Sequence, residues 1–428
     1  MTMFGLKEAE VATLTRAVAG DNLDRDGIRE AFARATWTGL AEPGDRLAVF
    51  LVQALGAARA LDVVVDRTPV SEVLEQLRQL GAEEIPAGEL QLALDRWMPR
   101  LVSATALLAM RQAARHGAGL LTPDAEGWPQ GVNDLGPHAP IALWCRGTGA
   151  ALAALPASIA LVGARAATGY GEHVAMEASA GLVDRGFAIV SGAAYGIDGM
   201  AHRAALASNG MTVAFLAGGV DRFYPSGHDA LLARIVEVGA VISELPCGQP
   251  PTKWRFLQRN RLIAAASQAT VVLEAGWRSG SLNTAGHAGQ MGRPVGAVPG
   301  PVTSAASAGC HRLIRSFAAT LVTNAEEMAE LVAPFSAGVG TDAPEPSAGR
   351  ASGPRTEVAP NRAERPRTSD ETRILDALSV RSPRTSTDIA ARSGLSVATA
   401  QSVLATLELE GVTVERERGW MRRTGGDG

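Results

Sequence analysis

Cysteine is scarce in this 428-residue chain, and its placement excludes two common kinds of site. The three cysteines, Cys145, Cys247 and Cys310, are odd in number and far apart, and they form no CxxC or Cys/His spacing. Disulfide bonds and a zinc site are therefore not expected, and a reducing compartment is. No metal and no cofactor are predicted.

Long apolar runs are missing as well. No stretch reaches the roughly 18 uninterrupted apolar residues of a membrane span, and the longest candidate, residues 150–164, is broken by Pro156. The first residues include Lys7, Glu8 and Glu10 and lack the charged and then apolar order of a signal peptide. We therefore expect a cytoplasmic protein that does not bind membranes.

Neither sign of charge dominates. The chain has 40 Lys and Arg against 44 Asp and Glu, a formal net charge of -4, which argues against a surface that is basic throughout. A local basic cleft remains compatible with this total, because a polyanion responds to the field at its own site. Aromatic residues make up only 4% of the chain, so aromatics inside a basic run are informative.

The length predicts two to three domains, and the apolar spacing changes along the chain. Residues 1–115 have the three- and four-residue spacing of a helical N-terminal domain. Residues 335–369 are rich in Pro, Ser, Ala, Gly and Arg, which predicts a disordered linker. Residues 370–424 show three short helical patterns, a helix break at Gly394 and a terminal strand pair, which favours a winged-helix domain.

The central residues 116–334 alternate short apolar segments with helical ones. The predicted strands are residues 158–162, 187–190, 212–217, 240–243, 270–274 and 294–298. Strands joined by crossover helices form a doubly wound, mostly parallel sheet of the Rossmann-like α/β class. Ligands of such sheets lie beyond the carboxyl ends of the strands, and this chain places its small, glycine-rich turns there.

Three of these turns can bind phosphate through backbone N–H groups and small side chains. The candidate contacts that they supply are Gly163, Arg165, Ser191, Gly192, Ser279, Gly280, Ser281 and Thr284. Each turn alone is also typical of simple helix capping, and Asp198 after the second turn is expected to be an N-cap. Their combination favours an anion site.

A basic and aromatic run, residues 253–261, carries four cations in nine residues. Its candidate contacts are Lys253, Phe256, Arg259, Asn260 and Arg261. We expect the last three to open an apolar helix, where the helix dipole disfavours cations unless an anion offsets them. Aromatic rings in such a run can stack on nucleobases. The alternative is a solvated surface whose aromatic rings are buried in the core.

In this order the motifs resemble those of the DNA-processing protein A family (DprA, also called Smf). The likeness covers residues 118–330. It is carried by Val162-Gly163-Ala164-Arg165, residues 191–198, His202, Tyr224-Pro225, Ser243-Glu244, Phe256 with Arg259-Asn260-Arg261, residues 279–284, and Val298-Pro299-Gly300. Members of this family often carry a helical N-terminal domain and a small winged-helix C-terminal domain.

The resemblance implies a recombination mediator that is not an enzyme. It would bind single-stranded DNA in a positively charged pocket, protect incoming DNA, form a homodimer and help load the RecA recombinase, as in natural transformation. It also implies that Arg165, Arg259 and Arg261 contact DNA. Reversing Arg259 and Arg261 to Glu is then expected to abolish strand binding and leave the fold intact.

Four positions depart from the family pattern. Ala164 replaces the usual serine of the first turn, and Leu257 stands where the family has proline. His311 stands where the family usually has asparagine, and Tyr195 where it more often has arginine. The change at Tyr195 removes a cation and leaves a stacking or a packing role open.

Two other functions stay open. One is a nucleotide hydrolase of the phosphoribohydrolase type, with Glu274 or Asp198 as the acid, although the Pro-Gly-Gly-x-Gly-Thr loop of those enzymes is absent. No nucleophile, base and orienting group occur together, which disfavours a hydrolase. The other is duplex recognition by the C-terminal domain. Its candidate recognition helix, residues 396–410, is poor in basic residues, so protein contact is at least as well supported.

Overall fold

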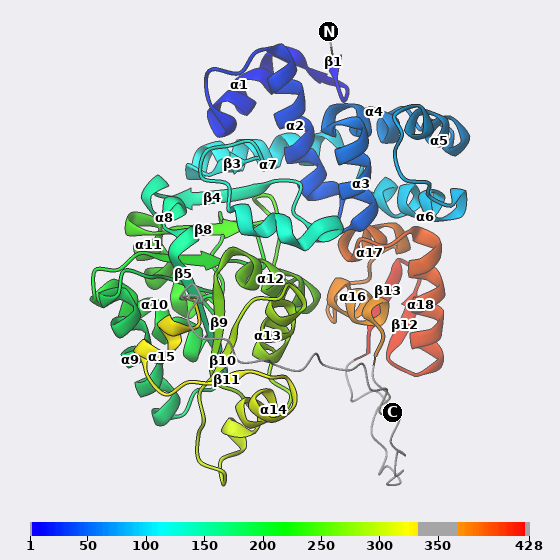
Figure 1. Cartoon of the computed structure of the whole chain (residues 1–428). Helices are drawn as coiled ribbons and strands as arrows, with labels where there is room; N and C mark the ends of the chain where they lie inside the picture. Colours follow the sequence, from blue (N-terminus) through cyan, green and yellow to red (C-terminus); the bar gives the residue numbers. More distant parts are fainter. Residues whose placement is uncertain (1, 333–366, 424–428) are drawn as a thin grey trace.

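The computed structural model describes residues 2–332 and 367–423 (Figure 1). The predicted linker, residues 335–369, lies outside the described residues except at its C-terminal end. Helices make up the first part of the chain, a nine-stranded sheet the centre, and a small unit of helices and a hairpin the C-terminal part.

The N-terminal part is helical, as its apolar spacing predicts. After a short hairpin of β1 (Thr2–Met3) and β2 (Leu6–Lys7) come α1 (Glu8–Ala19), α2 (Arg25–Leu40), α3 (Arg46–Leu55), α4 (Ala57–Val65), α5 (Val70–Gln79), α6 (Ala87–Trp97) and α7 (Ser103–His116). Asp24 and Asp45 cap α2 and α3 by accepting backbone N–H groups of the first turns. Trp37 and Trp97 pack edge to face, with ring centroids 5.0 Å apart, in a core that α2 to α6 share.

Burial in that core explains why α3 and α4 are apolar. Among the described residues no single helix is both long and apolar enough to cross a membrane. The helices α3 and α4 reach the required length and composition only as a pair, and that pair is bent by 114°.

The central sheet contains all six predicted strands and three more. The strands are β3 (Gly119–Leu121), β4 (Leu143–Gly147), β5 (Ser158–Gly163), β6 (Ala188–Ser191), β7 (Thr212–Phe215), β8 (Ala240–Ser243), β9 (Ala269–Glu274), β10 (Val295–Ala297) and β11 (Thr320–Leu321). Their order is β11-β10-β9-β5-β6-β7-β8-β4-β3. The strands from β11 to β8 are parallel to one another, and β4 pairs antiparallel with both β8 and β3. The Rossmann-like α/β prediction is thus confirmed.

Alternate residues of the strands face two helical layers, which appear on opposite sides of the sheet in Figure 1. Ile159 and Leu161 pack against one layer, and Ala160 and Val162 against the other. The first layer consists of α9 (Gly169–Asp184), α10 (Ile197–Ala207) and α15 (Ala325–Glu330). The second contains α12 (Lys253–Ala266), α13 (Ser281–Gln290) and α14 (Ala308–Ser316).

The remaining helices are short or lie near the β4 edge. They are α8 (Gly149–Ala153), α11 (Asp229–Val238) and the 3-10 turns η1 (Met98–Arg100), η2 (Gln130–His138), η3 (Leu155–Ala157), η4 (Ser226–His228) and η5 (Ala305–Ser307). Side chains of α1, α2 and α7, among them Phe32 and Met110, share a core with Trp144 of β4. The Trp144 Nε1 donates to the Thr38 hydroxyl at 3.0 Å. The N-terminal helices therefore cover the antiparallel edge of the sheet.

The C-terminal unit has the predicted winged-helix arrangement. It consists of α16 (Ser369–Ala377), α17 (Ser386–Ser393), α18 (Val397–Leu409), β12 (Thr413–Arg416) and β13 (Gly419–Arg422). Gly394 adopts the left-handed conformation with φ 66° at the end of α17, and Ser396 caps α18. Ile374, Leu404 and Trp420 lie in its own core. The unit sits with α16 against α12 and α17 against α6 and η1.

Candidate nucleic-acid interface

A cleft with a volume of about 620 Å³ opens where the strand order of the sheet reverses. From β5 the chain proceeds to β6, β7 and β8 on one side, whereas β9 and β10 lie on the other. The crevice beyond the carboxyl ends at such a point is the usual ligand site of doubly wound sheets. The predicted contacts that line it are Gly163, Arg165, Phe256, Arg259, Asn260, Ser279, Gly280, Ser281 and Thr284.

The turn after β5 is held tightly against β9. A Cβ atom at Gly163 would lie 2.6 Å from Ile197 Cγ1 and 2.8 Å from the Glu274 carbonyl oxygen, so the position has no room for a side chain. The Ala164 N–H donates to that same carbonyl at 2.7 Å. The chain then turns outward and leaves the Arg165 side chain exposed at the mouth of the cleft.

Arg259 lies at the floor of the cleft and is only 5% exposed. Its Nη1 donates to the Phe215 carbonyl at 2.6 Å, and its Nε has no hydrogen-bond partner among the described residues. Burial lowers the pKa of Arg259 to about 10, against the opposing effect of Asp198, so the guanidinium stays charged at neutral pH. The floor of the cleft thus carries a fixed positive charge, whose Nε is buried and has no partner among the described residues.

Asp198 supports this floor and does not cap a helix. The N-cap of α10 is Gly196, and the Asp198 carboxylate accepts the Gly192 N–H at 3.2 Å, so the N-cap prediction is wrong. Burial raises the pKa of Asp198 against the opposing charge of Arg259. A Cβ atom at Gly192 would lie 1.8 Å from Arg259 Nη1. Gly192 therefore makes room for the guanidinium, which is a positioning role.

Phe256 joins the cations of the cleft to an aromatic surface. Its ring centroid lies 4.9 Å from the guanidinium carbon of Arg165 and 5.7 Å from that of Arg259. On another side the Tyr224 ring approaches it with centroids 5.6 Å apart. Cation–π contacts of this kind order the two arginines around the ring.

The turn after β9 forms the opposite wall. Ser279 and Ser281 share a hydrogen bond between hydroxyls at 2.8 Å, and the Asn260 amide donates to the Gly280 carbonyl at 3.3 Å. Gly280 is the N-cap of α13, and Ser281 is the first residue of that helix. Asn260 thereby ties α12 to this wall.

Two exposed residues of the same wall were not selected from the sequence. Trp277 and Arg278 line the cleft, and Trp277 is 59% exposed. An aromatic residue next to a cation in a glycine turn is the signal that could have identified them. The Trp277 ring also stacks with Arg312, whose guanidinium carbon lies 5.0 Å from the ring centroid.

Glu274, the other candidate acid of the hydrolase alternative, has a structural role. It is 2% exposed, and its two oxygens accept the backbone N–H and the hydroxyl of Thr168 at 2.9 and 2.6 Å. Since Thr168 caps α9, the carboxylate fixes the start of that helix. Both of its oxygens are occupied, which leaves it poorly placed to take or give a proton in the cleft.

Four predicted contacts do not line the cleft. The buried Ser191 hydroxyl donates to the Leu161 carbonyl at 2.6 Å and so links β6 to β5. Gly192 lies beneath Arg259, and Lys253 is exposed at the start of α12. Arg261 is buried on the far side of α12.

The expectation that Arg259 and Arg261 open a helix is wrong. The helix α12 begins at Lys253 and is capped by the Thr252 side chain, so both arginines lie well inside it. The helix dipole therefore gives no reason to infer an anion at these positions. What sets them apart is burial of their guanidinium groups and the partners that they find.

Arg261 forms a buried ion pair. Its Nη1 and Nη2 bind the two oxygens of Glu244 at 2.7 and 2.8 Å, and its Nε donates to the His138 carbonyl at 3.2 Å. Glu244 also accepts the Gly44 N–H at 3.2 Å. This bidentate pair joins α12 to the loop after β8 and to the N-terminal part, and it uses the charge that DNA contact would require.

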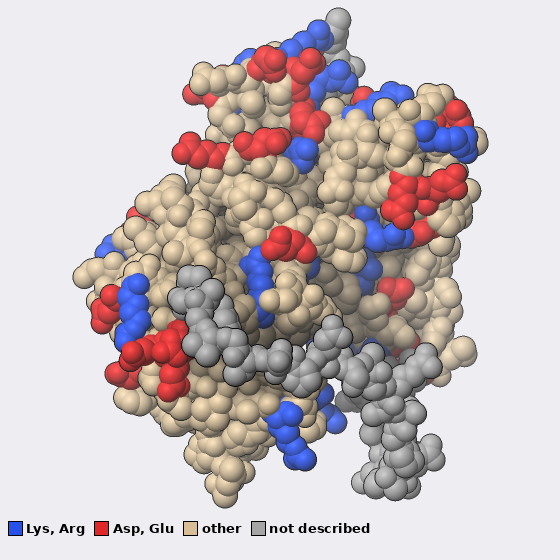
Figure 2. Space-filling view, in the orientation of Figure 1, with Lys and Arg blue, Asp and Glu red and all other residues tan. Residues whose placement is uncertain are grey.

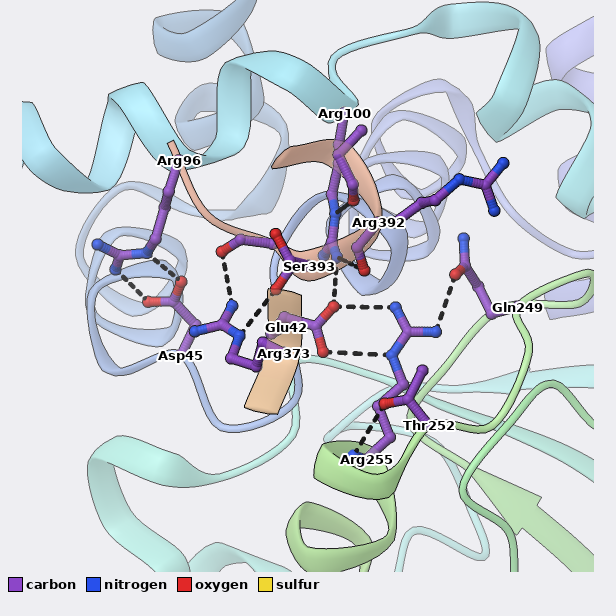
Figure 3. A network of polar contacts seen from close by, with 12 residues as sticks. Glu42, Asp45, Arg96, Arg100, Gln249, Thr252, Arg255, Arg373, Arg392 and Ser393 are labelled. Carbon is purple, nitrogen blue, oxygen red and sulfur yellow. Dashed lines mark hydrogen bonds and ion pairs between the residues drawn. The ribbon is translucent and has the colours of Figure 1, made fainter. Parts of the chain in front are cut away.

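Arg255, another cation of the run, lies at the junction with the C-terminal unit (Figure 3). Its Nη2 and Nε bind Glu42 at 2.9 and 3.3 Å, and Arg100 binds the same carboxylate. Burial raises the pKa of Glu42, but the charges of Arg255 and Arg100 lower it by more, and the net result is a pKa far below the usual range. Glu42 is therefore ionised in the folded protein.

The end of α17 completes this junction. Arg373 donates to the carbonyls of Ser393 and Gly394 at 2.7 and 2.6 Å, and Arg100 donates to the Arg392 carbonyl at 3.3 Å. Carbonyls at a helix C-terminus lack partners within the helix and carry partial negative charge, so arginines stabilise them. Figure 3 shows these groups converging on Glu42 from the N-terminal part, the core and the C-terminal unit.

The face of the molecule drawn in Figure 2 does not carry one dominant sign of charge. On the face seen in Figure 2, Lys and Arg lie in small separate groups among Asp and Glu. No group of three or more His, Cys, Asp or Glu within residues 2–332 and 367–423 is arranged to hold a metal ion. All three cysteines are buried, and burial raises the pKa of each thiol to about 12.

Comparisons with known proteins agree with this architecture. A family model for DNA recombination-mediator protein A matches residues 119–333, and one for the DprA winged helix domain matches residues 358–419. A Mycobacterium tuberculosis protein provisionally named DNA processing protein DprA is 46% identical over 316 residues, which are 72% of this chain and 77% of that protein.

More distant relatives show the same likeness. The DNA processing protein DprA of Bacillus subtilis is 31% identical over 254 residues, which are 59% of this chain and 83% of its own length. The X-ray structure of DNA processing protein A from Streptococcus pneumoniae aligns with a TM-score of 0.55 at 27% identity, over 70% of this chain and 96% of that one.

Proposed function

The chain belongs to the DNA-processing protein A (DprA/Smf) family, and we propose that it binds single-stranded DNA in the cleft beyond β5 and β9. The observation that carries the proposal is the Phe256 ring, which contacts the guanidiniums of both Arg165 and Arg259 and lines, with them, a cavity of about 620 Å³. The two guanidiniums suit phosphate, and the ring offers an aromatic face to a base.

A single strand fits this arrangement better than a duplex. In a duplex the bases are stacked inside, whereas an unpaired base can be turned out and placed on an aromatic ring. Phe256 is half-buried in the wall of the cleft, so its ring is not placed to enter a groove of duplex DNA. Hydrogen-bonding groups of Asn260 and Ser279 lie within the same cavity and suit the edges of a base or the sugar–phosphate backbone.

The protein would act as a binding mediator and not as an enzyme. Supporting this, Glu274 is engaged by Thr168, and Asp198 is buried against the Arg259 guanidinium and the Gly192 N–H. Membership of the family supports the further proposals that it protects incoming DNA, acts as a homodimer in the cytoplasm, and helps load RecA during recombination or transformation.

A titration of fluorescent oligonucleotides tests the proposal. We expect the wild-type protein to bind a single strand more tightly than a duplex of the same length, with an affinity that falls as salt rises. Phe256→Ala should weaken single-strand binding by about 1–3 kcal/mol, the usual contribution of one stacked base. Phe256→Tyr is the matched control, since it keeps the ring. Equal affinity for both forms of DNA, or full binding by Phe256→Ala, would contradict the proposal.

A further inference from the structure

Two exposed tyrosines lie at the same edge of the sheet as the cleft but outside it. Tyr195 follows β6 and is 49% exposed, and Tyr224 follows β7 and is 52% exposed. Neither ring lines the cavity itself. Since strands β5, β6 and β7 are neighbours in the sheet, both rings lie on the carboxyl-end edge that also carries Arg165.

Ring contacts connect these tyrosines to the cleft. Tyr224 packs on Phe256 with centroids 5.6 Å apart and an interplanar angle of 56°. Four residues further along the chain, His228 meets the Tyr195 ring edge to face at 4.9 Å. Each exposed tyrosine thus packs on another ring, Tyr224 on Phe256 of the cleft and Tyr195 on the buried His228.

Both exposed rings are held in place. The buried His228 that supports Tyr195 is anchored by a hydrogen bond between its Nδ1 and the Ala193 carbonyl at 3.0 Å. A Cβ atom at Gly227 would lie 2.7 Å from the Tyr195 hydroxyl oxygen, so the tyrosine packs directly over this glycine. Ordered aromatic rings lose little conformational entropy when a ligand stacks on them.

Cations accompany the rings, as a polyanion requires. Arg165 is exposed and contacts Phe256, and Arg222 is exposed two residues before Tyr224. Adjacent strands lie about 4.8 Å apart, so the turns from β9 to β7 span roughly 15 Å along this edge. That span is longer than one nucleotide bound over Phe256 would occupy.

From these contacts we propose that Tyr195 and Tyr224 form a second stacking site, which takes the bases of a DNA strand that leaves the cleft past Phe256. The inference rests on the proposed binding of single-stranded DNA and extends it to a longer footprint. Stacking on a ring depends little on base identity, so the site tolerates any sequence.

Two lengths of fluorescent oligothymidylate distinguish this site from the cleft. The short one, of about 4 nucleotides, suits the cleft alone, and the long one, of about 16 nucleotides, can reach both. Tyr195→Ala and Tyr224→Ala should each weaken binding of the long strand roughly 5- to 100-fold. Tyr195→Ala should leave the short strand unaffected, because Tyr195 stacks on His228 and not on Phe256. Tyr195→Phe and Tyr224→Phe keep the ring and should bind both strands like the wild type.

The outcomes separate this inference from the proposed function. If the wild-type protein binds neither strand, the proposed function fails and the second site with it. If the wild type binds both strands and the alanine variants bind the long one equally well, the second site is overturned and the cleft stands. Sedimentation of each variant completes the test. A changed oligomeric state together with unchanged strand affinity would show that the rings serve protein contact and would overturn the inference.

Discussion

Arg165 and Arg261 belong to motifs that point to the same ligand, yet their surroundings differ. Arg165 is exposed at the mouth of the cleft, and its guanidinium packs on the ring of Phe256. Arg261 is buried and binds both carboxylate oxygens of Glu244. Arg255 resembles Arg261, with Glu42 as its partner. The arginines of these motifs therefore divide into cations that hold the protein together and cations free to meet a phosphate, and the presence of a carboxylate partner decides between them.

Arg259 stands between these groups. Its guanidinium is buried like that of Arg261, but it lines the cleft, and its Nε has no partner among the described residues. Reversing Arg259 and Arg261 to Glu would place two carboxylates in buried positions, one of them against Glu244. The expectation that this double change leaves the fold intact is thus not supported, and the exposed Arg165 is a better probe of DNA binding.

Removing the shared carboxylate of the junction should have the largest effect. Glu42→Ala leaves Arg100 and Arg255 buried without their partner, which we expect to lower the free energy of unfolding by about 5 kcal/mol. Chemical denaturation monitored by circular dichroism measures it. Glu89→Ala, which breaks an exposed pair with Arg46, is the control and should cost below about 1 kcal/mol. Equal effects of the two changes would remove the distinction between structural and surface cations.

Breaking the second buried pair should rank next. Arg261→Ala leaves Glu244 buried without its guanidinium, and we expect a loss of about 3–5 kcal/mol in the free energy of unfolding. Below the temperature at which it unfolds, the variant should still bind single-stranded DNA, since Arg261 does not line the cleft. Wild-type stability together with lost DNA binding would mean that Arg261 belongs with Arg165.

The pH dependence of stability separates the same groups. The pKa of Glu42 is lower in the folded protein than in the unfolded chain, so ionised Glu42 contributes its full stabilisation above the unfolded pKa of about 4.3. That stabilisation is lost as the pH falls from there toward the folded pKa. Urea unfolding of the wild type and of Glu42→Gln, from about pH 7 to about pH 3, should show the difference in stability shrinking below about pH 4.3. A difference that stays constant with pH would exclude Glu42 as the titrating group.

The smallest effect is expected at Lys253. This residue is exposed at the start of α12 and lies outside the cleft, so Lys253→Ala should change strand affinity less than about threefold and stability by less than about 0.5 kcal/mol. Fluorescence anisotropy measures the affinity. A tenfold loss would extend the DNA surface along α12 toward the C-terminal unit.

The sequence predicted the parallel strands β5 to β10, because each is a short apolar segment followed by a small-residue turn, which is a local pattern; it did not predict the parallel strand β11. The turn at Gly394 was also predictable from a local pattern, because a glycine followed by the capping residue Ser396 marks the break between two helices. The six predicted strands did not include β4, which contains Trp144, follows Pro137 and Pro140, and gains its place by pairing with β8. Tertiary packing, and not local preference, makes that segment a strand.

The roles of the arginines could not be read from the sequence. Arg255 finds Glu42 at a separation of 213 residues, and Arg261 finds Glu244 at 17 residues in a different element. Spacing along the chain carries no sign of such pairs, because they form only once the sheet and the N-terminal helices have packed. The cleft residues Gly163 and Arg165 were predictable, since their motif lies at the carboxyl end of β5. Phe256 was predictable because it is an aromatic residue inside a basic run.

The salt dependence of single-strand binding by Arg165→Ala tests the central claim most directly. The slope of log K against log salt reports the phosphates that a protein neutralises. Relative to wild type, we predict that Arg165→Ala reduces the slope by about 1 and weakens binding, whereas the exposed Arg115→Ala of α7 changes neither. An unchanged slope for Arg165→Ala would contradict the account, because the one exposed arginine that contacts Phe256 would then not meet the strand.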